Sequence, residues 1–374
     1  MICLFTKWEN SKADTWSGTP LGILLSLQKL HGKKKIKDIA VSQKKVQRIL
    51  CKIARGVGKV FHINECEVIE HKIDDRIVKK HLMDCHDEPN IMFTEQLSKY
   101  IDNSYLFIDC SVDFAYRCQK GGETFSQYVP LKKTGKYSLI HIRRKRADVF
   151  YKKCRGIFTM GQWLADDLVK NTKVDEKKVH CVGGGCNISI EKIDDSKKQG
   201  NSILFVGKDF ERKGGFLVLD AFEILNDKFP GKYQLYIAGP KEWPGKGEIP
   251  KGVHFLGLKS TQELQKYYNL CDIFVMPSYF EAYGIVFAEA LIYGLPCIGR
   301  NAFAMKEFIS EGENGFLIQE DDAEYLAEKM HDLLSNEKIR RGVIQKKEYY
   351  IEKYSWESVA KRITDVILND GYEI

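Results

Sequence analysis

Short apolar runs alternate with amphipathic stretches along the first half of the 374-residue chain. Helical segments lie between most of the apolar runs, and this alternation is the signature of βαβ units and a parallel sheet. The runs that predict buried strands are residues 1–5, 36–41, 59–63, 90–94, 105–110, 156–160 and 178–182.

The same pattern restarts after a polar stretch at 191–201, which we interpret as a linker. Strands are predicted at 202–206, 233–238, 254–256, 273–276, 297–299 and 315–318, and helices at 216–228, 261–270, 284–293, 322–334, 337–353 and 355–368. We therefore expect an α/β fold of two Rossmann-like, doubly wound domains facing each other across a cleft. The expected domains are 1–190 and 191–355, with a last helix in 356–374 crossing back to the first domain.

Composition supports a globular protein with a core in each domain, because 44% of the residues are hydrophobic and no low-complexity tract is present. No apolar run approaches the roughly 20 residues of a membrane-spanning helix. The N-terminal MICLFTKWEN lacks the basic start and cleavage site of a signal peptide. Eleven cysteines without a CxxC pair suit a reducing compartment better than a disulfide framework. We expect a cytoplasmic protein.

The net charge of +7 is unevenly distributed. Residues 1–195 contain 35 Lys and Arg against 24 Asp and Glu, whereas residues 196–374 contain 23 against 27. Much of the excess lies at 33–37, at Lys44-Lys45 and at 143–146. These runs are either ordinary solvated faces or a surface that binds peripherally to the anionic inner face of a membrane. Nucleic-acid binding is not expected, because the runs lack interleaved aromatic residues and a recognition motif.

Two loops of the second half carry the residues that indicate a ligand. The first, GKDFERKGG, follows strand 202–206 and opens a helix, where phosphate-binding loops lie in this architecture. It matches neither the dinucleotide GxGxxG nor the P-loop. Arg212 and Lys213 precede two glycines at a helix start, so they would neutralise a diphosphate together with backbone donors. A basic pair in such a loop is by itself commonplace.

The second loop joins strand 273–276 to helix 284–293, and Glu281 and Glu289 bracket its end with seven residues between them. The N–H groups of Gly284, Ile285 and Val286 at the helix start would face an anion held between the two carboxylates. A ligand that fits this layout carries hydroxyl diols and a phosphate. A nucleotide-sugar has both.

A third loop, WSGTP, joins the first strand to a helix predicted at 21–30, with Thr19 as its cap and Pro20 at its first position. Gly18 in this small-residue loop would let a substrate or phosphate approach the backbone closely. An ordinary strand-to-helix turn has the same sequence features.

Taken together, these motifs resemble the family-four retaining glycosyltransferases (glycosyl transferases group 1), which have the B-type fold of two Rossmann-like domains. The E-x7-E spacing alone is unspecific, whereas the ordered set is specific. The motifs within 202–320 are FVGKDFERKGG, the FLG of 255–257, DIFVMPSYFEAYGIVFAEALIYGLP and EGENGFLI, and weaker similarity extends to WSGTP, IFTMGQWLADDLV and YSWESVAKRI.

The resemblance implies an acceptor-side first domain and a second domain that binds the donor. It implies that Arg212 and Lys213 bind the donor diphosphate and that Glu281 contacts the donor sugar, so these three would be the catalytic residues. Glu289 would bind the ribose diol. The other implied donor contacts are Gly18, Gly207, Lys208, Gly284, Ile285 and Val286. The chain departs from many relatives at Lys208 and Ala282, where they carry Arg and Gly.

The implied activity is that of a retaining hexosyltransferase, which moves a sugar from a nucleotide-diphosphate-sugar to a saccharide or lipid-linked glycan, as in polysaccharide biosynthesis. The resemblance also implies that the leaving diphosphate accepts the proton of the acceptor hydroxyl. Consistent with this, no carboxylate has the spacing of a nucleophile. Asp109 and Asp113, after strand 105–110, would orient the acceptor or else cap a helix. His141, in a basic helical stretch, is expected to be a surface residue.

No cofactor and no metal are expected. A hard cation would need a carboxylate pair at a strand end, and the paired aspartates fall in helical or linker segments. Two alternatives stay open from the residues themselves: a nucleotide-sugar epimerase of the same fold, and a non-catalytic nucleotide-sugar-binding protein. The sequence does not identify the base and sugar of the donor or the chemical nature of the acceptor.

Overall fold

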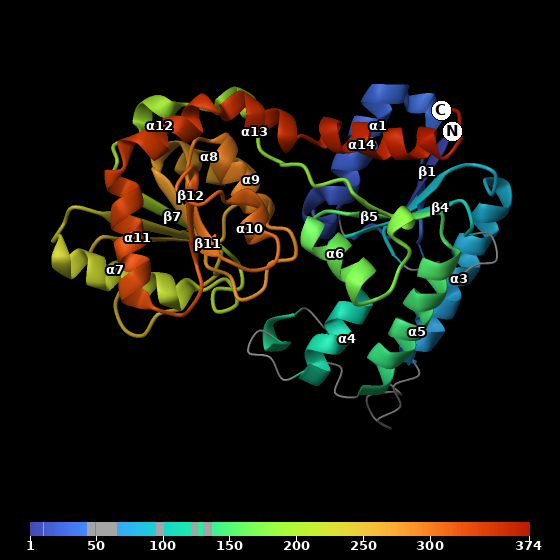
Figure 1. Cartoon of the computed structure of the whole chain (residues 1–374), viewed down its shortest axis with the longest axis horizontal. Coiled ribbons are helices and arrows are strands. Elements are labelled where there is room, and N and C mark those ends of the chain that lie inside the picture. The colour runs from blue at the N-terminus through green and yellow to red at the C-terminus, as the bar shows by residue number, and fades with distance from the viewer. Residues whose placement is uncertain (10, 43–48, 50–65, 95–100, 122–125, 130–136) are drawn as a thin grey trace. The chain divides into compact units, whose positions relative to one another are not determined.

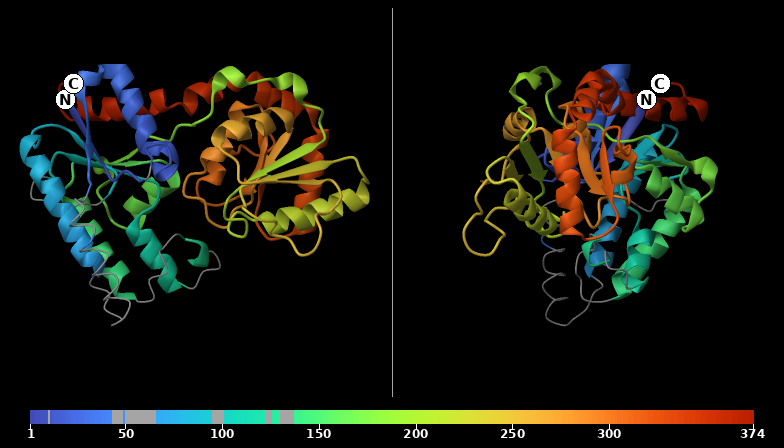
Figure 2. Two further views of the ribbon diagram at one scale, coloured as in Figure 1. Left: turned by 180° about the vertical axis from the view of Figure 1, so that it is seen from behind. Right: turned by 60° about the vertical axis from the view of Figure 1, so that its left-hand side comes forward.

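The computed structural model describes residues 1–9, 11–42, 49, 66–94, 101–121, 126–129 and 137–374. Its contacts divide the chain into two compact units, each with its own parallel sheet. Unit 1 comprises Met1–Gly184 and Trp356–Ile374, and unit 2 comprises Gly185–Ser355 (Figure 1). Figure 2 shows the strands of each unit running between helices, as expected for doubly wound α/β units.

The six described strands of unit 1 pair in the order β2-β1-β3-β4-β5-β6, and every pairing is parallel. The direction in which the sheet grows reverses between β1 and β3, which makes this gap the topological switch point. The strands are β1 Ile2–Thr6, β2 Ile36–Ala40, β3 Asn90–Met92, β4 Ser104–Ile108, β5 Gly156–Thr159 and β6 Val179–Cys181. The strand predicted at 59–63 and the pair Lys44-Lys45 lie outside the described residues.

The described helices of unit 1 are α1 Thr19–His31, α3 Cys66–Asp84, α4 Val112–Gly121, α5 Tyr137–Lys153, α6 Gln162–Lys170 and α14 Trp356–Asn369. The predicted cap of α1 was wrong: Thr19 is already helical, and Gly18 is the N-cap with φ 80°. The last helix, α14, packs on α1, where the ring of Trp356 occupies the space that a side chain at Gly22 would need. His31 and Thr364 also join the two helices by a 2.8 Å hydrogen bond.

The sheet of unit 2 has the order β12-β11-β10-β7-β8-β9, again with parallel pairings throughout. Counted within the unit this is the order of a dinucleotide-binding Rossmann sheet, with its switch point between β7 and β10. The strands are β7 Ser202–Val206, β8 Gln234–Ala238, β9 Val253–Gly257, β10 Ile273–Val275, β11 Cys297–Arg300 and β12 Gly315–Ile318.

The helices of unit 2 are α7 Gly215–Lys228, α8 Thr261–Leu270, α9 Ile285–Ile292, α10 Met305–Phe308, α11 Ala323–Ser335, α12 Glu337–Gln345 and α13 Lys347–Lys353. The single helix predicted over 337–353 was wrong, because Lys346 leaves the helical conformation with ψ 12°. The break lets α13 pack against α9 and bury Tyr350, whose hydroxyl accepts a hydrogen bond from Asn314.

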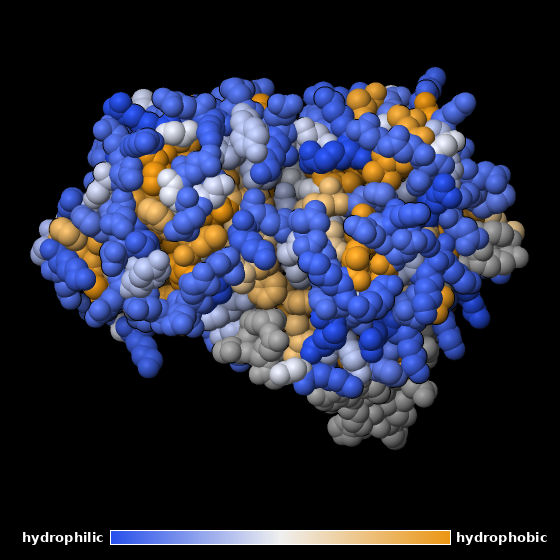
Figure 3. Space-filling model, in the orientation of Figure 1, coloured by the Kyte–Doolittle hydropathy of each residue, from blue (hydrophilic) through white to orange (hydrophobic). Residues whose placement is uncertain are grey.

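The face seen in Figure 3 is mostly hydrophilic, with apolar patches scattered among charged residues. Within the described part of the chain, no helix combines the length and the apolar character that crossing a bilayer requires.

Candidate functional site

The candidate site of unit 2 is formed by the loops after β7 and β10, the two strands that flank the switch point. Ligands of open α/β sheets bind beyond the carboxyl ends of the strands at such a point. The two loops are tied together by their backbones, since the N–H of Tyr279 donates to the carbonyl of Arg212 over 2.9 Å. The tie brings Lys213 and Glu281, 68 positions apart in the sequence, into one site.

Lys213 and Glu281 form an ion pair across the two loops. Their side chains are 12% and 10% exposed, so the pair is nearly dry. Burial lowers the pKa of the Lys213 ammonium, while the Glu281 carboxylate acts in the opposite direction. The hydroxyl of the buried Ser278 lies 3.4 Å from the same carboxylate oxygen, Oε2. A cation held by a single carboxylate at a switch point is suited to exchange that partner for a ligand anion.

Arg212 lies beside this pair, but its side chain has partners in both loops. Its Nε donates to Asp209 over 3.0 Å and its Nη1 donates to the carbonyl of Phe280 over 2.7 Å. The guanidinium therefore braces one loop against the other. Contact of Arg212 with a diphosphate stays a prediction, and such contact would compete with the exposed Asp209.

Two glycines with left-handed backbone shape the site. Gly214 has φ 75°, and a Cβ there would lie 2.5 Å from the carbonyl oxygen of Pro277. Gly284 has φ 91° as the N-cap of α9, and a Cβ there would lie 2.9 Å from Cγ of Glu281. Any other residue would be strained at both positions. At Gly214 it would also push the two loops apart, and at Gly284 it would displace Glu281 within its own loop.

The other donor-binding residues predicted in unit 2 lie around the same edge of its sheet, whereas Gly18 is the N-cap of α1 in unit 1. Gly207 is buried and its N–H donates to Ala238, whereas Lys208 is exposed. Ile285 and Val286 are half-buried in the first turn of α9, where N–H groups have no partner within the helix. The helix start therefore offers backbone donors next to the Lys213–Glu281 pair.

Glu289 lies deeper in the same helix and already has partners in the protein. The hydroxyl of Tyr268 on α8 donates to its Oε2 over 3.0 Å, and the N–H of Asn187 also bonds to its carboxylate. Burial raises the pKa of the Glu289 carboxyl to about 7, although both hydrogen bonds oppose the shift. A ribose diol would have to share this carboxylate with Tyr268, and that role of Glu289 stays a prediction.

The predicted acceptor-side residue Asp109 follows β4 in unit 1 and accepts a 3.1 Å hydrogen bond from the indole N–H of Trp16. Trp16 lies in the turn η1 Thr15–Gly18, just before α1. Trp16 and Ser17 have φ of 44° and 54°, and Gly18 continues the left-handed run. Left-handed backbone costs roughly 1–2 kcal/mol at each residue with a side chain, and such strain is typical of functional sites.

Asp113 is held quite differently. Its carboxylate accepts from Arg117 over 3.0 Å, from Arg144 and from Thr172 over 3.1 Å. Burial alone would raise the pKa of this carboxyl, but the hydrogen bonds from Arg117 and Arg144 lower it below its usual value. Neither aspartate is the cap of α4, because Ser111 Oγ accepts from the N–H of Phe114. The donors around Asp113 indicate a structural role.

Sequence reasoning missed Ser278, Tyr268 and Trp16. The only signal for Ser278 was its place in the loop after β10, and Tyr268 lies on the buried face of a correctly predicted helix. Trp16 stands next to the SGTP loop, where its large side chain was not interpreted. Predicted as a surface residue, His141 is exposed on α5.

Residues 188–349 match the model of the family glycosyl transferases group 1, which confirms the resemblance inferred from the motifs. D-inositol 3-phosphate glycosyltransferase of Corynebacterium urealyticum is 27% identical over 175 residues, covering 43% of this chain and 41% of that protein. Phosphatidyl-myo-inositol mannosyltransferase of Mycolicibacterium smegmatis is 25% identical over 179 residues, covering 46% of each chain. The chain spans about half the length of the curated relatives it matches.

Solved structures match over nearly the whole chain. WaaG, a glycosyltransferase involved in lipopolysaccharide biosynthesis, aligns with a TM-score of 0.67 at 16% identity, covering 98% of this chain and 99% of WaaG. Sucrose-phosphate synthase of Thermosynechococcus elongatus aligns with a TM-score of 0.63 at 13% identity, covering 98% of each. These likenesses confirm the predicted fold class, that of the B-type glycosyltransferases with two Rossmann-like units.

Proposed function

We propose that this chain is a retaining glycosyltransferase that moves a hexose from a nucleotide-diphosphate-sugar to a saccharide or lipid-linked glycan. The observation that carries the proposal is the buried Lys213–Glu281 pair at the switch point of unit 2, within the region that matches the family model. The epimerase alternative requires an acid and a base at one site. At the unit 2 switch point, the carboxylate of Glu281 is ion-paired with Lys213 and that of Asp209 with Arg212. This arrangement of paired charges favours anion binding over acid–base chemistry.

Lys213 and the first N–H groups of α9 would stabilise the leaving diphosphate, because both are preorganised donors in a nearly dry site. Glu281 would accept hydroxyls of the donor sugar once Lys213 turns to the phosphate. In unit 1, Asp109 would orient the attacking hydroxyl of the acceptor. That hydroxyl attacks the anomeric carbon on the face from which the diphosphate leaves, and the diphosphate oxygen takes its proton.

The test is to incubate purified protein with a panel of nucleotide-sugars and to measure release of free nucleoside diphosphate. A transferase hydrolyses its donor slowly without acceptor and faster when the right acceptor is added. An epimerase converts the nucleotide-sugar without releasing diphosphate, and a binding protein shifts its melting temperature without turnover. The anomeric proton coupling of the transfer product then reports retention or inversion.

The acceptor panel includes simple glycosides, lipid-linked saccharides and inositol phosphate, since the names of both curated relatives described above contain inositol. A cytoplasmic site of action is part of the proposal. It is supported by the described cysteines, all of which are free thiols.

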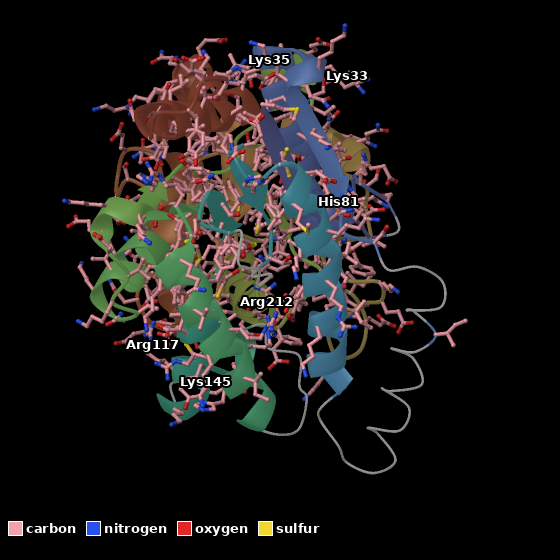
Figure 4. The ribbon with its side chains drawn as sticks, turned by 90° about the vertical axis from the view of Figure 1, so that its right-hand side faces the viewer. Lys33, Lys35, His81, Arg117, Lys145 and Arg212 are labelled. Carbon is pink, nitrogen blue, oxygen red and sulfur yellow. The ribbon has the colours of Figure 1, made fainter. Side chains whose placement is uncertain are left out.

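Peripheral contact of unit 1 with an anionic membrane is also a proposal, and the structure narrows its test. Arg144 and Arg146 are engaged in ion pairs with Asp113 and Asp75, so reversing them would disturb the fold. Arg143 and Lys145 have no ion pair among the described residues. Figure 4 shows Lys145 and Lys33 toward opposite ends of unit 1, so the runs at 33–37 and 143–146 do not form one continuous face.

We expect the protein to co-sediment with vesicles rich in phosphatidylserine at low salt and to dissociate at high salt. The double substitution Arg143→Glu, Lys145→Glu should abolish binding if the α5 end is the contact. The matched control is Lys33→Glu, Lys34→Glu at the other end. Wild-type protein that stays in the supernatant at low salt would refute membrane contact.

A further inference from the structure

Trp16 joins three segments of unit 1 at the carboxyl edge of its sheet. Trp16 belongs to the loop after β1, and its ring packs edge-on against Phe93, just after β3, with ring centroids 6.1 Å apart. It also packs edge-on against Phe107 at the end of β4, at 5.9 Å. Its indole N–H donates to Asp109, two residues further along. Trp16 therefore spans the switch point between β1 and β3, where this class of sheet receives its ligands.

The rings of Phe93 and Phe107 lie nearly perpendicular to the indole, at 81° and 77°, and the indole N–H is bonded to Asp109. Phe93 and Phe107 are buried, but Trp16 and Asp109 are half-buried and stay in reach of a ligand. A large aromatic ring next to a carboxylate is a common arrangement of small-molecule sites, in which the ring supplies apolar contact and the polar group fixes orientation.

The backbone shows that this placement of Trp16 does not follow from local preference. Trp16, Ser17 and Gly18 all have φ between 44° and 80°, a left-handed run that residues with side chains rarely adopt. The run is stabilised by the tertiary contacts of the indole, so the ring and the carboxylate of Asp109 are preorganised as one unit.

We propose that Trp16 and Asp109 form the acceptor subsite of unit 1 and that its ligand is a pyranose ring. The apolar C–H face of the sugar lies on the indole, and a sugar hydroxyl donates to Asp109. Trp16 is thus both a contact for the sugar and a positioning residue, because its N–H fixes the carboxylate of Asp109 over 3.1 Å. The inference rests on the proposed transferase function and deepens it by naming the class of acceptor group.

Two substitutions separate the two tasks of Trp16. Trp16→Leu removes the aromatic platform and should raise the acceptor KM about tenfold or more. Trp16→Phe keeps a ring but removes the N–H, so it should lower kcat with a smaller change in KM. In the Asp109→Asn background, Trp16→Phe should cause little further loss of kcat, since residues that act through one contact are not additive. In the control variant Trp8→Leu, described next, acceptor-independent hydrolysis of the donor should stay within about twofold of wild type.

The matched control is Trp8→Leu. Trp8 also donates its indole N–H to an aspartate, Asp38, over 3.1 Å, and it belongs to the same loop. Its partner lies in β2, away from the switch point between β1 and β3. Trp8→Leu should leave the acceptor KM unchanged. Comparable losses in the Trp8 and Trp16 variants would show a general effect on the loop and would overturn the proposal.

A binding measurement decides the matter without turnover. The indole ¹⁵N–¹H signal of Trp16, assigned by its absence in Trp16→Phe, should shift on titration with methyl α- and β-glycopyranosides of glucose, galactose and mannose. It should not shift with glycerol, which has hydroxyls but no ring. Absence of a shift with every pyranoside, or an unchanged acceptor KM in Trp16→Leu, would overturn the proposal. Failure of the wild type to hydrolyse any donor would instead refute the transferase function.

Discussion

Unit 1 and unit 2 each hold a buried carboxylate against basic side chains, and the two arrangements differ in how completely the charges are partnered. Asp113 accepts from Arg117, Arg144 and Thr172, and these donors hold its pKa below the usual range. Lys213 has Glu281 as its one ion-pair partner among the described residues, and burial lowers the pKa of its ammonium. A carboxylate with a full set of donors is part of the scaffold, whereas a dry cation with one partner can accept a ligand anion.

The largest expected effect is on Lys213. Lys213→Ala should lower transfer by about a hundredfold to a thousandfold, as for loss of one preorganised donor to a developing charge. The double variant Arg212→Ala, Lys213→Ala should abolish it. The measurement is kcat/KM for the donor, with Lys228→Ala at the exposed end of α7 as control. Transfer within threefold of wild type would show that Lys213 only balances Glu281.

Asp113→Asn should lower the stability of unit 1 and leave kcat unchanged. Removing the charge from a buried, multiply paired carboxylate leaves Arg117 and Arg144 facing each other and should cost about 3 kcal/mol in the free energy of unfolding. Urea denaturation measures this loss. The kcat of the folded fraction should equal that of wild type. A stable variant with depressed kcat would instead place Asp113 in the acceptor site.

Glu289 and Glu281 should contact different parts of the nucleotide-sugar donor. Glu289→Ala should weaken free nucleoside diphosphate and nucleotide-sugar alike, by about tenfold, because a hydrogen bond to a charged group is worth roughly 1.5–3 kcal/mol. Glu281→Ala should lower kcat by a similar factor and leave the affinity for free nucleoside diphosphate almost intact. Isothermal titration calorimetry distinguishes them, and an equal loss of affinity in both variants would contradict the division.

The raised pKa of Glu289 predicts a pH dependence of nucleotide binding. A carboxylate accepts hydroxyl hydrogen bonds better than its protonated form, and the pKa of about 7 means that protonation occurs within the neutral range. Affinity for nucleoside diphosphate should therefore rise severalfold from pH 6 to pH 8. The phosphate of the ligand titrates near pH 6 as well, so Glu289→Gln is the control. Its profile should be flatter than that of wild type, and identical profiles would exclude Glu289 as the titrating group.

The smallest expected effect is that of chelation. If Lys213, Arg212 and the start of α9 hold the diphosphate, excess EDTA should leave the transfer rate unchanged. Inactivation by EDTA with recovery in Mn²⁺ would show that a divalent cation shares the diphosphate. Among the described residues, no cluster of three His, Cys, Asp or Glu side chains has the geometry to bind such a cation by itself.

Elements with local signals were predicted well. The strands Ser202–Val206 and Gly315–Ile318 and the helix Thr261–Leu270 have the predicted bounds. The helix begins at a capping box in which Ser260 and Glu263 bond each other's backbone, a signal contained within four residues. The helix over 337–353 failed because its break at Lys346 depends on how α13 packs on α9, which no local pattern records.

By itself, the sequence determined the alternating strands and helices, the glycine positions and the ordered motifs that indicate a glycosyltransferase, because these depend on neighbours a few residues apart. The tertiary structure decided which charges meet. Lys213 reaches Glu281 across 68 positions and Trp16 reaches Asp109 across 93. The tertiary structure also decided that the carboxylate of Asp113 accepts from two arginines and that Glu289 accepts a hydrogen bond from Tyr268. The physical reason is that strand order brings the loops together, and burial then sets how strongly each charge depends on its partners.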